Sequence, residues 1–293
     1  MPLLRANGVS LAYTDTGTPP GRPDAPTILF GHGLLFGGWM FRPQIDVLRD
    51  RYRCVTVDWR GQGETPATAG GYDMDTLCDD AEALIRELDL APVHFVGLSM
   101  GGFVGLRLGA RRGRLLRSLT VLDTTADGEP RDAARKYTLF AWIYQLLGAA
   151  PLKQQVLPTL FGPDFLNSRR SEPVVHEWSA RLSRSSRTGI RKAILAVADH
   201  AAIGDELADI VAPTLVIVGA DDNATPRLDA ERLVARIDGS TVQVVPAAGH
   251  TSNLEQPHIV TACLASFLHS VDNELGDLSK ATASLDGVGH GTH

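Results

Sequence analysis

Cysteine is scarce in this sequence. The 293 residues include three cysteines, Cys54, Cys78 and Cys263, which lie far apart along the chain. An odd number at such spacings matches neither a disulfide framework nor the ligand spacing of a metal site. We interpret the three as small buried side chains of a protein in a reducing compartment, which predicts a cytoplasmic location.

The sequence also has no long apolar run and no strong excess of either charge. No uninterrupted apolar stretch reaches about 18 residues, so no membrane span is expected. The stretch MPLLRANGVSLAY lacks the charged segment and apolar core of a secretory signal. The net charge of −6 comes from interspersed acidic and basic residues, which favours neither nucleic acid nor anionic membrane as a partner. A small-molecule substrate is the expected partner, and association into a homo-oligomer stays open.

Short apolar runs recur along the chain, each followed by a glycine-rich turn and an amphipathic segment. They are TILFGHG, CVTVDWRG, VHFVGLS, LTVLDTT, TLVIVGADD and VQVVPAAGH. Because these runs show little polar alternation, they predict an α/β fold with a parallel sheet covered by helices on both faces. The opening stretch GVSLAYTDTG alternates more and predicts an antiparallel edge hairpin. Helices are expected at residues 39–49, 74–88, 100–112, 227–236 and 254–268.

The strand rhythm stops after Asp123 and resumes at Thr214. The helical stretches AARKYTLFAWIYQLLGAA and HEWSARLSRSSRTGIRKAILAVADH lie between them. This predicts a helical cap, residues 126–205, inserted into a core made of residues 1–125 and 206–272. Residues 273–293 are polar and glycine-rich and are expected to form a disordered tail.

Ser99 is the first candidate for chemistry. It lies between Gly97 and Gly101, after an apolar strand and before a predicted helix. This pattern is typical of a nucleophile elbow, where a sharp turn projects the serine hydroxyl above the edge of the sheet. The helix that follows would direct its dipole and free amides at the same place.

A serine hydroxyl is a poor nucleophile at neutral pH, so it needs a base and an acid that orients the base. His250 is the best-placed base because it follows the last strand in VQVVPAAGH. We interpret the histidines in other contexts as packing or surface residues; they include His94, His176, His200, His258 and His269.

Three aspartates end strands and could supply the acid. Asp221 and Asp222 follow the run TLVIVG, and Asp123 ends the run LTVLD. The residues alone leave the three open, although Asp221 could instead cap its turn. Two amides are expected to form the oxyanion hole, those of Met100, directly after the nucleophile, and of Leu34 in the loop GHGLLFGG.

The chain resembles the α/β-hydrolase fold superfamily. The matching motifs are His32-Gly33, DWRGQGET (58–65), GLSMGG (97–102), GADDNATP (219–226) and AGHTSNLEQP (248–257). The resemblance implies a mostly parallel, eight-stranded-type sheet with an inserted helical cap. It also implies a catalytic triad of Ser99, His250 and Asp222, because the family's acid follows a glycine and two further residues.

Within the superfamily, the chain resembles small carboxylesterases, cofactor-free haloperoxidases (perhydrolases) and 3-oxoadipate enol-lactonases. Ser99 differs from the aspartate nucleophile of dehalogenases, and Thr251 differs from the tryptophan that often follows the histidine of carbon–carbon hydrolases. The resemblance implies a serine esterase acting on small to medium hydrophobic acids, with no cofactor and no metal. The alternatives are a lactonase or perhydrolase at the same site, or a small-molecule receptor without turnover.

The cap should shape the substrate pocket. Apolar residues recur at helical spacing in the first cap segment: Leu139, Phe140, Trp142, Ile143, Leu146 and Leu147. They either dock the cap on the core or wall a pocket over Ser99; for the pocket we predict Phe140, Trp142 and Ile143, together with Phe36 and Trp39. No Lys or Arg lies within 139–152, which favours neutral esters, although Arg187 and Arg191 could reverse this. Activity should fall on acidification through roughly pH 6 to 7, as an ordinary histidine becomes charged.

Overall fold

The computed structural model describes residues 1–286, with side chains up to Leu275. Within these residues the strands form one eight-stranded sheet in the order β1-β2-β4-β3-β5-β6-β7-β8. They are β1 (Leu3–Ala6), β2 (Val9–Asp15), β3 (Thr27–Gly31), β4 (Arg53–Val57), β5 (Val93–Leu98), β6 (Leu116–Leu122), β7 (Thr214–Gly219) and β8 (Thr241–Val245). β2 pairs antiparallel with β1 and β4, and the other neighbours are parallel. The predicted fold class is confirmed.

The edge hairpin has different bounds from those predicted. Residues Val9–Asp15 form a single strand, β2, and the other arm of the hairpin is β1. Asn7 and Gly8 connect them with φ values of 45° and 74°. Positive φ at both central residues is the signature of a two-residue hairpin turn, and an Asn-Gly pair adopts it readily. The turn therefore lies at the start of the alternating stretch, whose first residue is Gly8, and the first arm of the hairpin precedes that stretch.

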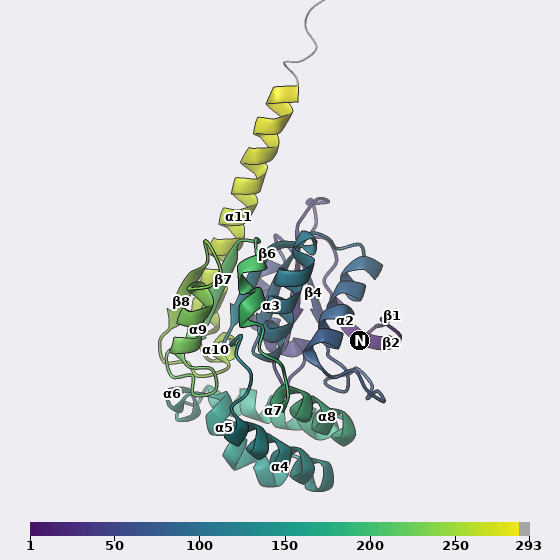
Figure 1. Cartoon of the computed structure of the whole chain (residues 1–293), viewed down its shortest axis with the longest axis vertical. Coiled ribbons are helices and arrows are strands. Elements are labelled where there is room, and N and C mark those ends of the chain that lie inside the picture. The colour runs from purple at the N-terminus through teal and green to yellow at the C-terminus, as the bar shows by residue number, and fades with distance from the viewer. Residues whose placement is uncertain (287–293) are drawn as a thin grey trace, which may run out of the picture.

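Helices cover both faces of the sheet (Figure 1). α2 (Met74–Glu87), α3 (Met100–Arg112) and α9 (Arg227–Val234) share one buried apolar cluster with Leu29 and Val55. α1 (Arg42–Leu48) and α11 (Pro257–Asp286) share a second cluster with Ile28 and Phe30. Neighbouring strand residues thus enter opposite clusters, as expected for a sheet buried on both sides. The same part of the chain also contains three short 3-10 turns: η1 (Gly38–Phe41), η2 (Gly113–Leu115) and η4 (Gly204–Asp209).

Two predicted helices are each divided. The stretch 39–49 forms η1 and then α1, with Pro43 in the first turn of α1. The stretch 254–268 belongs to α10 (Ser252–Glu255) and to α11, which begins at Pro257. Proline favours the first turn of a helix and disrupts its interior, so each proline marks a new start.

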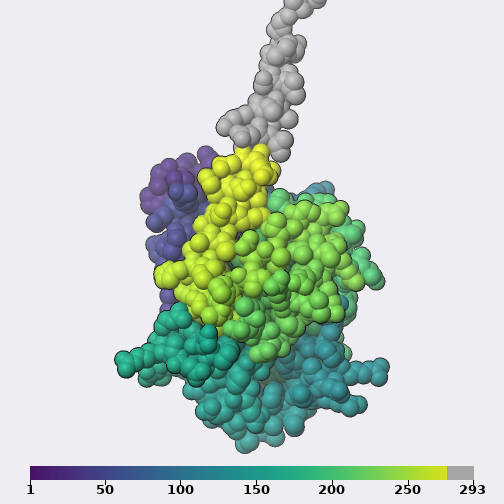
Figure 2. Space-filling model, turned by 90° about the vertical axis from the view of Figure 1, so that its left-hand side faces the viewer, coloured from purple at the N-terminus to yellow at the C-terminus, as the bar shows by residue number. Residues whose placement is uncertain are grey.

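Five α-helices lie between β6 and β7: α4 (Arg131–Leu147), α5 (Lys153–Leu160), α6 (Pro163–Leu166), α7 (Ser171–Arg184) and α8 (Arg187–Ala198), with the 3-10 turn η3 (Ala150–Leu152). We call α4–α8 the cap helices. They gather beneath the sheet in Figure 1, and they form the teal lower part of the molecule in Figure 2. The second cap stretch contains two helices, because the side chain of Ser186 accepts from Gly189 N and starts α8.

The C-terminal segment differs from its prediction. α11 continues to Asp286 and extends away from the sheet (Figure 1), so the expected disorder from residue 273 is wrong for 273–286. NELGDLSKATASLD contains a single glycine among Leu, Glu, Lys and Ala, which are good helix formers. Residues 287–293 of the predicted tail lie outside the described residues. Among the described helices, none has both the length and the apolar character needed to cross a bilayer.

Candidate active site

Ser99 lies on the sharp turn between β5 and α3. Its backbone has φ 53° and ψ −115°, a conformation that residues with side chains rarely adopt. A Cβ atom on Gly97 would collide with the carbonyl oxygen of Gly101, and a Cβ atom on Gly101 would collide with that of Gly31. The glycines on both sides of Ser99 therefore let α3 approach the sheet closely enough for the turn to form.

The structure brings Ser99, His250 and Asp222 together in one hydrogen-bonded chain. His250 Nε2 lies 2.8 Å from Ser99 Oγ, and His250 Nδ1 lies 3.0 Å from Asp222 Oδ2. Asp222 follows β7 and His250 follows β8, so both reach Ser99 from the carboxyl ends of parallel strands. In this arrangement Nδ1–H donates to Asp222 and Nε2 is left to accept the proton of the serine.

Several donors hold Asp222 in its charged form. Its carboxylate accepts from Ala224 N at 2.8 Å, from Thr225 N at 3.1 Å and from Thr225 Oγ1 at 2.8 Å. Burial raises the pKa of Asp222, but the His250 ring and the Thr225 donors outweigh burial and hold this pKa below its usual value. Asp222 is thus a fixed anion behind His250.

His250 is correspondingly easier to protonate. Its side chain is buried, and burial lowers the pKa of a histidine because it disfavours the charged ring. The Asp222 carboxylate outweighs this effect, with smaller contributions from Asp123 and Glu255, and the pKa of His250 rises to about 9. This differs from the sequence-based expectation of an ordinary histidine, because the carboxylate was then considered only as an orienting group.

The other two candidate acids do not contact His250. Asp123 is fully buried and accepts from Gly219 N at 2.8 Å and from Ser252 Oγ at 2.6 Å. Burial, together with the charge of Asp222, raises the pKa of Asp123 well above its usual value. Asp221 joins the turn through its backbone amide, which donates to Ala248 O at 2.8 Å. Of the three, the geometry favours Asp222 as the partner of His250.

The loop after β3 offers the expected oxyanion donor. Leu34 lines the same cavity as Ser99, and Met100 begins α3 directly after Ser99. Among the hydrogen bonds of the described residues, neither the Leu34 amide nor the Met100 amide has an acceptor. Both amides are therefore available to an oxyanion at Ser99.

Gln62 is a residue of this site that the sequence analysis did not assign. It is almost fully buried; its Oε1 accepts from Leu35 N at 2.9 Å, and its Nε2 lies 3.7 Å from Met100 Sδ. Leu35 has a φ of 69°, so its conformation needs support from neighbours. The Gln62 side chain thus connects the two backbone segments that would form the oxyanion hole. Its Oε1 accepts from the Leu35 amide, which is next to that of Leu34. The DWRGQGET motif contained it, but the sequence held no sign of this contact.

His32 fixes the beginning of the same loop. Its Nε2 accepts from Trp59 N at 3.0 Å and its Nδ1 lies 2.7 Å from Gly33 O. Burial lowers the pKa of His32, which keeps the ring neutral with the proton on Nδ1. The ring therefore holds the Gly33 carbonyl in place immediately before Leu34.

Glu255 connects the His250 loop to the cap. Its buried carboxylate accepts from Gly249 N and Gly162 N, both at 2.9 Å, and from Thr251 Oγ1 at 3.0 Å. Gly162 follows α5, so one side chain ties the residue before His250 to the cap helices. The sequence analysis missed this role, because the partner amides lie 93 and 6 residues away along the chain.

A cavity of about 110 Å³ opens above Ser99 between the core and the cap helices. Of the predicted pocket residues, Phe36 and Phe140 line it, together with Leu34. Trp39, Trp142 and Ile143 do not. Trp39 instead packs on Phe36, with ring centroids 5.8 Å apart.

The geometry of α4 explains the error. Tyr137, Phe140 and Tyr144 occupy one face of this helix and line the cavity. Trp142 is two residues from Phe140, about 200° around the helix, and is 51% exposed beneath the Arg191 guanidinium. Ile143 is half-buried and packs against the second apolar cluster. The predicted stripe therefore mixed residues from two faces.

Polar residues in the cavity were also missed. Lys153, at the start of α5, and Glu129, before α4, both line it. Lys153 lies one residue beyond the stretch 139–152, which sequence inspection had found free of Lys and Arg. Arg187 and Arg191 do not line this cavity. In the described part of the chain, no group of three or more His, Cys, Asp or Glu side chains could hold a metal ion.

Comparison with known proteins identifies the family of the chain. The alpha/beta hydrolase family matches residues 28–262, and the chain belongs to this family. It is 31% identical to 3-oxoadipate enol-lactonase 2 of Acinetobacter baylyi, over 90% of this chain and 96% of that relative.

Two solved structures extend the comparison. An enol-lactonase of Burkholderia xenovorans gives a TM-score of 0.84 at 27% identity, covering 92% of this chain and 100% of that chain. A malate-bound thermophilic esterase of Thermogutta terrifontis also gives 0.84 at 27% identity, covering 92% and 98%. The chain is therefore similar in fold both to a protein named as an esterase and to one named as an enol-lactonase.

Proposed function

We propose that this protein is a serine hydrolase that cleaves carboxylic esters through an acyl-enzyme. The observation that carries the proposal is the unbroken chain from Asp222 through His250 to Ser99 at the floor of an apolar cavity. Ester hydrolysis by this family's relatives is consistent with it. A cytoplasmic location and a small-molecule substrate are part of the same proposal.

In the first half of the reaction, Ser99 Oγ attacks the ester carbonyl carbon while its proton passes to His250 Nε2. The carbonyl oxygen becomes an oxyanion, to which the amides of Leu34 and Met100 donate. The charge of Asp222 stabilises the imidazolium that forms at His250. When the tetrahedral intermediate collapses, His250 gives its proton to the departing alcohol oxygen, and the acyl group stays on Ser99.

In the second half, water replaces the alcohol. His250, now neutral, takes a proton from this water as it attacks the acyl carbon, and the same amides receive the second oxyanion. Collapse returns the proton to Ser99 Oγ and releases the carboxylic acid. The cavity favours acyl groups whose part next to the carbonyl is compact and hydrophobic, because its walls are mainly aliphatic and aromatic.

A lactonase is the second candidate. In a lactone, the departing alcohol stays joined to the acyl group. The cavity over Ser99 must therefore hold both groups together, as one ring. The similarity to enol-lactonases in both sequence and structure favours this candidate. The same three side chains would perform both reactions.

The test is hydrolysis of 4-nitrophenyl butyrate and of γ-lactones by the wild type and by Ser99→Ala. We expect the variant to lose kcat by about a millionfold and to unfold at an unchanged temperature. Retention of more than a few per cent of the activity would mean that another residue is the nucleophile. Tight binding of esters and lactones by the wild type without turnover would favour a receptor instead.

A further inference from the structure

Glu129 is an acidic residue of the cavity above Ser99 that the proposed mechanism does not use. It precedes α4 and lines the cavity together with Thr225 and His250. Burial raises the pKa of Glu129, and the nearby His250 ring lowers it. The carboxylate itself is therefore partly removed from solvent and lies on the side of the cavity that carries His250.

This carboxylate has no partner in the part of the chain that the structure describes. It neither accepts a hydrogen bond nor forms a salt bridge there, in contrast to Asp127, whose carboxylate lies 3.3 Å from Arg232 Nη1. Tyr137 also lines the cavity, and its hydroxyl likewise forms no hydrogen bond among the described residues. Burial and the charge of Glu129 raise the pKa of Tyr137 to about 12, so the two groups are neighbours. Polar groups removed from solvent are normally paired, and these two are available to a ligand.

The segment that carries Glu129 is fixed on both sides. Before it, the Asp127 carbonyl oxygen lies 2.9 Å from His200 Nε2, and a Cβ atom on Gly128 would lie 3.1 Å from His200 O. After it, Pro130 has a φ of −57° and directly precedes the first residue of α4. Glu129 is thus held between two anchored residues at the entrance to the cap.

The position of Glu129 corresponds to the alcohol side of an ester. His250 Nε2 gives its proton to the departing alcohol oxygen, so this oxygen lies next to His250. The carbonyl oxygen points at the amides of Leu34 and Met100 instead. The alcohol group therefore extends along the wall beside His250, where Glu129 lies. Because Glu129 and His250 interact without forming a salt bridge, space remains between them for this group.

The basic side chain of the cavity belongs to another wall. Lys153 begins α5, and it also lines a neighbouring space together with Ser183 and Arg187, which Glu129 does not line. Lys153 and Glu129 form no salt bridge among the described residues. The unpaired charge at the alcohol side is therefore the negative charge of Glu129.

We propose that Glu129 and Tyr137 form a subsite for an alcohol that carries an ammonium group, so that the substrate is a carboxylic ester of an amino alcohol. This rests on the proposed function, because the departing oxygen lies at His250 Nε2 while Glu129 receives the rest of the alcohol. In a half-buried site, opposite charges attract more strongly than at the surface. An aromatic ring such as that of Tyr137 also attracts a cation.

The experiment compares two butyrate esters of nearly the same shape. One is 2-(trimethylammonio)ethyl butyrate, and the other is its neutral counterpart, 3,3-dimethylbutyl butyrate; titration of the released acid at pH 9 follows both. We expect the wild type to have the higher kcat/KM for the cationic ester. In Glu129→Gln, the ratio of kcat/KM for the cationic ester to kcat/KM for the neutral ester should fall about tenfold.

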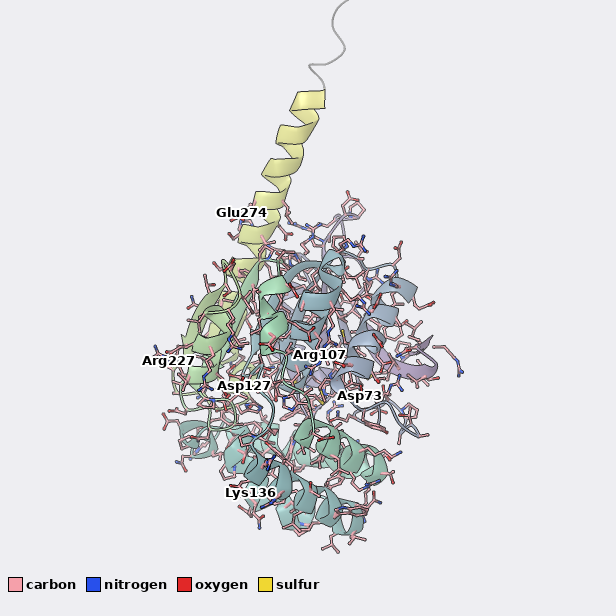
Figure 3. The ribbon with its side chains drawn as sticks, viewed as in Figure 1. Asp73, Arg107, Asp127, Lys136, Arg227 and Glu274 are labelled. Carbon is pink, nitrogen blue, oxygen red and sulfur yellow. The ribbon has the colours of Figure 1, made fainter. Side chains whose placement is uncertain are left out.

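Asp127→Asn is the matched control. Asp127 lies in the same segment between β6 and α4, at the boundary between the core and the cap helices (Figure 3). Its side chain is exposed and does not line the cavity above Ser99, so the ratio should not change in this variant. Equal falls in Glu129→Gln and Asp127→Asn would identify a long-range effect of net charge and overturn the subsite.

Glu129 could instead act only through the charge of His250. In that case Glu129→Gln shifts the pH midpoint of kcat/KM for the neutral ester and leaves the ratio between the two esters unchanged. This result would also overturn the subsite, because it involves no contact with the alcohol.

A binding measurement reads the subsite without turnover. Calorimetry with Ser99→Ala should detect the cationic ester and should show about tenfold weaker binding after Glu129→Gln is added. Equal binding by both proteins would overturn the subsite even if ester hydrolysis is robust. If the wild type hydrolyses neither ester while the binding difference persists, the proposed function is wrong and the subsite stands.

Discussion

At the scale of single residues, His250 has to serve two opposed requirements. Catalysis needs its neutral ring as a base, whereas the Asp222 carboxylate favours the charged ring and raises the pKa of His250 to about 9. The folded pKa lies above the unfolded value, so this interaction stabilises the fold fully below about pH 6.5 and is lost as the pH rises through about 9. Activity and this part of the stability should therefore change in opposite directions with pH.

The first prediction follows from that raised pKa. The kcat/KM for 4-nitrophenyl butyrate should increase with pH, with a midpoint above the ordinary histidine value of about 6.5 and toward 9. The expectation of pH 6 to 7 from sequence alone is thereby revised upward. Initial rates between pH 5 and pH 10, corrected for spontaneous hydrolysis, measure the midpoint. A midpoint at or below 6.5 would mean that the Asp222 carboxylate does not stabilise the protonated ring of His250 in the free enzyme.

The second prediction separates the two buried aspartates. Asp222→Asn should lower kcat by about ten-thousandfold, because an amide cannot stabilise the imidazolium and favours the wrong tautomer. Asp123→Asn should lower kcat by no more than about tenfold, because Asp123 binds Gly219 and Ser252 and does not contact His250. Circular dichroism verifies that both variants are folded. If the two losses were reversed, the acid would be the residue after β6.

Residue patterns identified Ser99 and His250 because each follows a strand within a distinctive short motif. They could not choose among the aspartates, because Asp123, Asp221 and Asp222 all end strands; the choice came from resemblance. Gln62 and Glu255 escaped notice for a physical reason. The contacts of Gln62 with Leu35 and Met100, and that of Glu255 with Gly162, join segments that meet only in the folded chain, and no local spacing encodes such contacts.

At the scale of elements, α4 has two apolar faces with different surroundings. One face carries Tyr137, Phe140 and Tyr144 toward the cavity. The other leaves Leu139, Trp142 and Leu146 at 60%, 51% and 70% exposure. Periodicity reveals that a helix is apolar but not which of two apolar faces meets the core, so the predicted pocket included Trp142.

The third prediction uses this pair of faces. Phe140→Ala should enlarge the cavity and shift relative kcat/KM among acetate, butyrate and hexanoate esters by about 1 to 3 kcal/mol. Trp142→Ala is the matched control on the outer face and should leave these ratios unchanged. Specificity that changed equally in both variants, or in Trp142→Ala alone, would contradict the orientation of α4.

At the scale of the whole molecule, core and cap meet at the His250 loop. Glu255 accepts from Gly162 N next to the cap and from Gly249 N in the loop, and Thr251 Oγ1 lies 3.0 Å from both Glu255 Oε1 and Leu160 O, either of which can accept its proton. The cap is therefore joined to the segment that carries the base, not only packed upon the sheet.

The fourth prediction tests this connection. Glu255→Ala leaves several buried donors without an acceptor and should lower the free energy of unfolding by about 3 kcal/mol. It should also lower kcat, because the loop holding His250 loses its support. Urea titration measures the stability. Glu231→Ala, which removes an exposed carboxylate from α9, should cost less than about 1 kcal/mol; equal costs for the two variants would contradict the tie.

The arrangement of the whole chain was the easiest feature to predict. Apolar runs such as TLVIVG are buried on both faces, and only a covered, mostly parallel sheet satisfies several of them at once. The tail was mispredicted from residue 273 because its polar composition suggested disorder while its helix propensity continued. The arrangement of the cap helices depends on packing against the core, which composition does not reveal.

The most direct test of the central claim is covalent trapping of the nucleophile. Diethyl 4-nitrophenyl phosphate reacts with an activated serine: Oγ attacks phosphorus, 4-nitrophenolate departs, and the diethylphosphoryl group remains for peptide mass spectrometry to locate. We predict one label per chain, on Ser99, formed at the same rate as esterase activity is lost, and no label on Ser99→Ala. Inactivation with the label on any other residue, or full esterase activity in chains labelled on Ser99, would contradict this account.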